Sequence, residues 1–139
     1  MADVSDPRIK ESYADVRNDK TETNWAVFKY EGKKKIVFGG KGNGDLSELA
    51  GQFNDDEAAF AFLRVTTGDE ESKRAKFVLV SWCGEKVGAL ARANMSVHKA
   101  SVKDICRDFA LERHYTDKSE IDAAALLADV TKAGGANYG

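Results

Sequence analysis

The sequence contains few of the residues that would indicate a disulfide scaffold, a metal centre or several domains joined by linkers. Its 139 residues include two cysteines, two histidines and one proline. No strictly apolar run, including residues 123–128, exceeds six residues, whereas a helix that crosses a bilayer needs about 20. No membrane-spanning segment is therefore expected. Because internal repeats and proline- or serine-rich linkers are also absent, the chain is predicted to form one domain.

The cysteines and histidines do not form a reactive or metal-binding pattern. Cys83 lies in an apolar, strand-like run and Cys106 in a helical pattern, so both are expected to be buried free thiols. His98 and His114 have no second histidine, cysteine pair or carboxylate cluster at metal-ligand spacing. The sequence therefore predicts no metal site, and no nucleophile supported by a base and an orienting acid.

The glycine-rich segment 39–44 invites comparison with a phosphate-binding loop. Gly44 is followed by Asp45 and Leu46 instead of the Lys and Ser or Thr of a P-loop, and the dinucleotide pattern G-x-G-x-x-G is absent. The segment is expected to be a flexible turn. We therefore expect a protein that is not an enzyme and holds no cofactor.

Positive and negative charges are nearly balanced. The chain has 21 Lys and Arg against 23 Asp and Glu, a formal net charge of −2. Since nucleic-acid binding draws on a strongly basic surface, this balance argues against a dedicated nucleic-acid-binding protein. The amino terminus lacks the basic residues and apolar stretch of a secretory signal, so a cytoplasmic location is expected.

The first half of the chain alternates between helical and strand patterns. Asp6, followed by the proline, is typical of a helix start. Residues 25–30 and 36–38 are rich in β-branched and aromatic residues on either side of a turn, which predicts a hairpin. Asp45 is placed to cap a short helix, and alternation over residues 59–66 predicts a third strand.

The second half predicts a central strand and two further helices. Residues 77–82 are apolar on both alternating faces, as in a strand that is covered on both sides. A helical pattern runs over residues 91–113, with either a short edge strand or the helix end at 109–115. An Asp and a Glu are expected to cap a last helix over 121–132, which stops at Gly134. The order predicts an α/β domain with a central mixed β-sheet sandwiched between helices on both faces.

Two clusters of cations stand out from this otherwise balanced surface. One precedes the predicted central strand, and the other recurs every four residues on the helix face opposite its apolar stripe. They consist of Lys73, Arg74 and Lys76, and of Lys99, Lys103 and Arg107. Local basic surfaces of this kind suit docking onto an acidic partner. The alternative is that both clusters are solvated surface.

Several short motifs occur in a fixed order over nearly the whole chain. They are Asn24-Trp25, residues 28–32, 60–64, 66–69, 72–77 and 82–85, and the ending from Lys132 to Tyr138. In this order and at this spacing the chain resembles the ADF/cofilin-homology family of actin-binding domains, and its coactosin-like branch in particular.

The resemblance implies one ADF-homology domain over residues 1–139, with residues 132–139 as a flexible tail. It further implies a non-catalytic, monomeric protein of the cytoplasm and actin cytoskeleton that has no cofactor and binds neither nucleic acid nor membrane. Members of the branch bind the side of filamentous actin, neither sever nor depolymerise it, and counteract barbed-end capping.

The resemblance also implies which residues contact the filament. Lys76 matches the contact lysine of the branch's Ser-Lys-Arg-x-Lys-Phe motif, and Arg74 is its neighbour. Arg92 and Met95 match a basic residue and a methionine, three positions apart, on the long helix of cofilins. The rest of that cofilin motif is not reproduced.

Two other functions stay open at this point. Vertebrate members of the branch also bind a lipoxygenase through a lysine near the carboxyl end, and Lys132 matches that region. The chain would then be a scaffold or chaperone for a non-actin partner. A cofilin-like protein that binds actin monomers and severs filaments is the other alternative.

Overall fold

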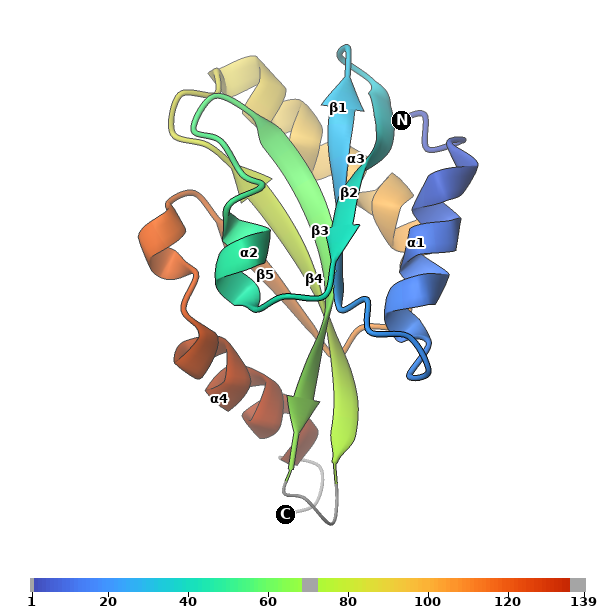
Figure 1. Cartoon of the computed structure of the whole chain (residues 1–139). Coiled ribbons are helices and arrows are strands. Elements are labelled where there is room, and N and C mark those ends of the chain that lie inside the picture. The colour runs from blue at the N-terminus through green and yellow to red at the C-terminus, as the bar shows by residue number, and fades with distance from the viewer. Residues whose placement is uncertain (1, 69–72, 136–139) are drawn as a thin grey trace.

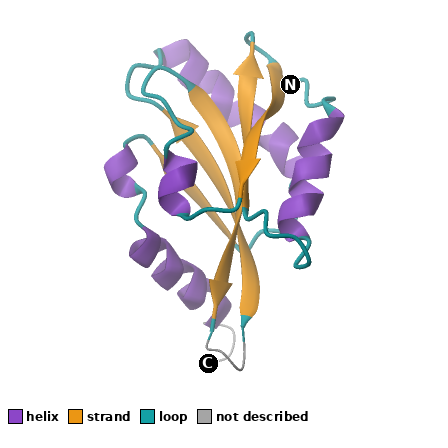
Figure 2. Ribbon diagram, in the orientation of Figure 1, coloured by secondary structure: helices purple, strands orange, loops and turns teal. Residues whose placement is uncertain are grey.

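The computed structural model describes residues 2–68 and 73–135. A five-stranded sheet is covered by α1 (Pro7–Arg17) and α3 (Ala89–Ile105) on one face, and by α2 (Leu46–Ala50) and α4 (Ala123–Gly135) on the other (Figures 1 and 2). The predicted α/β sandwich is therefore confirmed. Within the described ranges no helix is both long and apolar enough to cross a membrane.

The sheet is mixed because its last strand runs parallel to its neighbour. Its strands are β1 (Trp25–Glu31), β2 (Lys35–Gly42), β3 (Ala58–Thr67), β4 (Arg74–Cys83) and β5 (Leu111–Tyr115), in the order β2-β1-β3-β4-β5. The first four pair antiparallel, and β5 pairs parallel with β4. Both apolar faces of β4 are explained by this position, since a helix layer covers each side.

Alternate residues of the central strands enter two separate cores. Phe28, Phe60 and Phe62 pack under α1 and α3. On the opposite face Trp82 stacks on Phe53, with ring centroids 5.0 Å apart and planes 4° from parallel. Large side chains from neighbouring strands thus fill each side of the sheet, as period-two alternation requires.

Asp6 starts α1 and also ties it to the sheet. Its carboxylate accepts hydrogen bonds from the backbone N–H of Arg8, at 3.0 Å, and from the N–H of Phe38 on β2, at 2.9 Å. The Arg8 guanidinium pairs with the same carboxylate. This guanidinium, together with the two backbone donors, holds the pKa of Asp6 well below its usual range.

The predicted flexible turn at residues 39–44 is wrong for residues 39–42, which belong to β2 and pair with β1. A Cβ at Gly42 would lie 2.5 Å from the Trp25 ring, so this strand position has no room for a larger side chain. The glycine there permits a close approach between strand and indole.

The predicted helix over residues 91–113 is too long. The helix ends at Ile105, Cys106 leaves the helical conformation with a ψ of 72°, and the N–H of Ala110 donates to the Phe77 carbonyl at 2.8 Å. The chain then enters β5. The short edge strand, one of the two predicted alternatives, is therefore the one present. Cys83 and Cys106 are buried free thiols, as predicted, and burial raises the pKa of Cys106 to about 12.

The carboxyl-terminal helix also differs from its predicted bounds. The Asp117 and Glu120 capping box belongs to a short 3-10 helix, Lys118–Glu120. Asp122 Oδ2 accepts from the N–H of Ala125 in the first turn of α4, and the helix continues to Gly135. Residues 132–135 of the predicted tail are thus helical, and residues 136–139 lie outside the described part of the chain.

Candidate functional site

A two-stranded ribbon projects from one end of the sheet. β1 pairs with β3 as far as Leu63, and β5 pairs with β4 from Val78 onward. Residues 64–67 and 74–77 therefore pair with each other beyond the sheet's other strands, at the lower end of Figure 1. We call this segment the ribbon. It carries part of the first cation cluster.

Strand alternation decides which way the ribbon's cations point. Lys76 lies opposite Val65, which packs on the core beneath α2 and α4, and Val78 on the same strand face is buried in that core. Arg74 shares this face by period-two alternation. Phe77, between these positions, packs on the opposite core instead. Lys76 and Arg74 thus share the face that α4 covers.

The first cation cluster wraps around the ribbon. Lys73 precedes β4 and lines a hollow of about 370 Å³ with Asp19, Arg64 and Thr66 on the side of α1. Arg74 also borders this hollow. The three cations of this cluster therefore lie on two sides of the ribbon.

Arg64 fixes the base of the ribbon to the end of α1. Its guanidinium donates to the carbonyls of Val16, at 3.2 Å, and of Asn18 and Thr21, both at 3.0 Å. These carbonyls include orphan acceptors at a helix end, where a cation also faces the negative end of the helix dipole. Arg64 therefore has a positioning role.

The second cation cluster is not the continuous helical stripe that its spacing predicts. Lys99 and Lys103 both pair with Glu112 of β5, the former at 3.6 Å. The hydrogen bond from Lys103 is the main cause that holds the pKa of Glu112 below its usual value. Arg107 lies past the end of α3, where its Nε donates to the Asp104 carbonyl at 2.8 Å. The predicted continuous basic stripe is therefore wrong. Lys99 and Lys103 pair with Glu112, and α3 ends before Arg107.

The amino-terminal half of α3 is exposed, but Met95 is not. Arg92 is exposed, whereas Met95 is 3% exposed and packs in the core beneath α3. The Met95 side chain therefore does not form part of the exposed surface of α3. Leu90 and Val97, which no sequence motif singles out, are 76% and 61% exposed on this half of the helix. Their seven-residue spacing places both on one side of the helix, away from its buried stripe, and this spacing could have indicated an exposed apolar pair.

The candidate residues gather at opposite ends of the molecule. The beginning of α3, with Arg92, lies at the end away from the ribbon (Figure 1). The last turns of α4 instead lie beside the ribbon, since Val130 and Val65 belong to the same core. Lys132 is in the last turn of this helix. The structure thus joins Arg74 and Lys76 with the end of α4, and separates them from Arg92.

Two histidines are held neutral by their surroundings. His98 Nδ1 is 2.7 Å from the Tyr30 hydroxyl, and His114 Nδ1 is 2.8 Å from Ser81 Oγ. Burial is the main cause that lowers the pKa of both imidazoles. Burial also raises the pKa of Tyr30 to about 12, so its hydroxyl keeps the proton. His98 is buried and packs against Tyr30 of β1, whereas His114 is exposed on the edge strand.

These histidines predict a loss of stability in mild acid. The unfolded chain takes up protons near the ordinary histidine pKa of about 6.5, while the folded chain takes them up at lower pH. The free energy of unfolding should therefore fall as the pH drops from about 7 to 5. Urea unfolding at several pH values measures it, and His98→Gln should flatten the dependence. Equal stability across this range would contradict the assignment.

The described residues contain no group of His, Cys, Asp and Glu able to hold a metal ion. The fold is instead that of a family of actin-binding domains. The model of the cofilin/tropomyosin-type actin-binding protein family matches residues 1–131, and the chain belongs to this family. The family consists of non-enzymatic actin-binding proteins.

Several of the family members to which the chain is most similar are coactosins. Dictyostelium discoideum coactosin is 52% identical over 139 residues, which cover 99% of this chain and 95% of that protein. Rat coactosin-like protein is 42% identical over 127 residues, covering 91% and 88%. A crystal structure of human coactosin-like protein superposes with a TM-score of 0.88 at 35% identity, covering 95% of this chain and 99% of that one.

Proposed function

We propose that the chain binds the side of actin filaments through the ribbon, and that it does so without severing or depolymerising them. Lys76 and Arg74 are the principal contacts, and Lys73 is an auxiliary one. The observation that carries the proposal is the projection of these cations beyond the sheet, on the face shared with α4. Mouse coactosin, which is 38% identical with a TM-score of 0.79, is an actin filament binding protein.

The ribbon suits charge pairing with acidic side chains of a large partner. Two-stranded projections reach past the bulk of a domain, and the pairing of β3 with β4 holds Lys76 and Arg74 on one face. Such pairs become stronger where an interface partly excludes water. The start of α3 is a second contact in this proposal, through the exposed Arg92. Lys99, Lys103 and Arg107 belong to its periphery.

Filament binding should weaken as salt is added. Charged contacts near the rim of an interface are screened within a Debye length of about 10 Å at 0.1 M salt. We therefore expect the affinity for filaments to fall several-fold between 50 and 200 mM salt, as estimated from this screening. High-speed cosedimentation with filamentous actin measures this dependence. Failure to pellet at the lower salt concentration would overturn the proposal.

Filaments should keep their length when the protein is added. The buried Met95 leaves the cofilin-like contact on α3 incomplete, so neither severing nor monomer binding is expected. Fluorescence microscopy of preformed filaments should give the same mean length with and without the protein. Elongation from barbed ends in the presence of a capping protein should increase. Shortened filaments would support the cofilin-like alternative instead.

A second candidate rests on Lys132, which is exposed in the last turn of α4. A cation there suits an acidic partner other than actin, such as a lipoxygenase in an organism that has one. Lys132→Glu should abolish capture of that enzyme and, because Lys132 lies near the ribbon, weaken cosedimentation with filaments less than Lys76→Glu does. Loss of both activities together would show that the two partners share one surface.

A further inference from the structure

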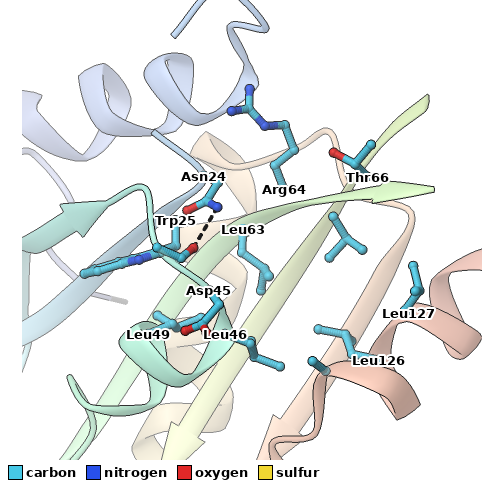
Figure 3. Close-up of a pocket in the computed structure, with 13 residues that line it drawn as sticks. Asn24, Trp25, Asp45, Leu46, Leu49, Leu63, Arg64, Thr66, Leu126 and Leu127 are labelled. Carbon is cyan, nitrogen blue, oxygen red and sulfur yellow. Dashed lines mark hydrogen bonds between the residues drawn. The ribbon is translucent and has the colours of Figure 1, made fainter. Parts of the chain in front are cut away.

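An apolar groove lies between α2 and α4, with β3 as its floor (Figure 3). Its volume is about 260 Å³. Large aliphatic side chains from all three elements converge on it: Leu46, Leu49, Leu63, Val65, Leu126 and Leu127. Leu127 is 43% exposed, although most side chains of this size are buried in the described part of the chain. The groove is thus open to solvent along its α4 side.

The groove is continuous with the cations of the ribbon. Val65 lines it and lies directly opposite Lys76 in the pairing of β3 with β4. Arg74 stands on the same face, two residues further toward the ribbon's end. A single partner segment can therefore contact these cations and the groove at the same time.

Most polar groups around the groove already have partners. The Asn24 Nδ2 donates to the Gly44 carbonyl at 2.8 Å, whereas its Oδ1 is buried without a hydrogen-bond partner. The Asp45 carboxylate accepts from Ser47 Oγ and from the N–H of Glu48, and Arg64 is bound to the carbonyls at the end of α1. Apart from the Asn24 Oδ1 acceptor, the free surface of the groove is apolar, so a large aliphatic or aromatic side chain suits it.

We propose that the groove receives an apolar side chain of the actin subunit that the ribbon contacts. This side chain is carried on a segment whose carboxylates pair with Lys76 and Arg74. The inference rests on the proposed filament binding and adds its apolar anchor. Exposed charge pairs contribute more to the orientation of the partner and to the rate of association than to the affinity. A side chain that fills a desolvated pocket at the centre of an interface supplies affinity that salt does not screen.

Two substitutions on α4 test the anchor without touching a charge. Leu127→Asn removes apolar surface from the groove wall, and Ala123→Trp fills the groove from an exposed position that lines it. Each should weaken cosedimentation about tenfold, the loss expected from one apolar side chain, and by a similar factor at 50 and 200 mM salt. Ala124→Trp is the matched control, because Ala124 is exposed on the same helix but does not line the groove.

The outcomes separate this inference from the function on which it rests. Weakened binding by both variants at both salt concentrations, with the control unchanged, supports the anchor. Wild-type affinity in Leu127→Asn and Ala123→Trp overturns it and leaves filament binding in place. If the wild-type protein itself does not pellet, filament binding fails and the anchor fails with it. Thermal unfolding of each variant establishes that the fold is retained.

Discussion

Replacement of Lys76 by Glu is expected to weaken filament binding about 30-fold or more at low salt, equivalent to roughly 2 kcal/mol. The reversal removes an attractive pair and places a carboxylate against acidic side chains of the filament. Lys76 is half-buried at the base of the ribbon and lies opposite Val65, so its side chain has little freedom to turn away. Cosedimentation over a range of filament concentrations gives the affinity.

A charge reversal elsewhere separates this contact from the effect of net charge. Lys10 is exposed on α1, which covers the opposite face of the sheet. Lys10→Glu changes the net charge by the same amount and should leave filament affinity nearly unchanged. Equal weakening by both variants would assign the effect to the net charge. Wild-type binding by Lys76→Glu would remove the ribbon from the interface.

The largest effect on stability is expected from Gly84→Ala. An added Cβ would lie 2.1 Å from the Asp55 carbonyl oxygen and 2.7 Å from that of Asn54. Both atoms belong to the backbone and cannot rotate away. The N–H of Gly84 also donates to the Glu57 carbonyl at 3.0 Å, which fixes the two segments together. We expect the free energy of unfolding to fall by about 3 kcal/mol, the upper part of the usual range for overpacking.

Gly88→Ala is the matched control, four residues along the chain. A Cβ at Gly88 meets nothing within 4 Å, so the substitution should cost less than about 1 kcal/mol, the loss expected at a helix N-cap. Urea unfolding of both variants gives the comparison. Wild-type stability in Gly84→Ala would contradict this expectation, because it would mean that the turn after β4 shifts to accommodate the added methyl group at no cost in stability.

Local signals were sufficient to predict much of the fold. The start of α1 depends on an Asp and a Pro that act within one turn, and the strands depend on alternation within a few residues. Residues 39–42 could not be assigned in this way. Their place in β2 depends on pairing with β1, and the glycine at position 42 leaves space for the Trp25 ring, which is distant in sequence.

The end of α3 could not be predicted for a similar reason. Apolar residues continue at helical spacing past Ile105, and Phe109 packs against the same core although the helix has ended. Burial of Phe109 is therefore compatible with either conformation. A tertiary contact decides between them, since the N–H of Ala110 bonds to β4 and directs the chain into β5.

The candidate site was predictable in part. Lys76 follows from the resemblance, and strand alternation alone places it on the same face as Arg74. The burial of Met95 was available from its spacing with His98 and Val102, which are also buried on α3. The groove between α2 and α4 was not predictable, because its walls come from segments that only the tertiary fold brings together.

The division of the interior into two cores has a consequence for how this domain can vary. Side chains of the two cores are separated by the sheet, because each strand residue points to one face or the other. The face with the groove and α4 can therefore exchange residues to suit another partner, while α1 and α3 continue to hold the sheet in shape. In such a domain the fold can stay the same while the binding preference changes.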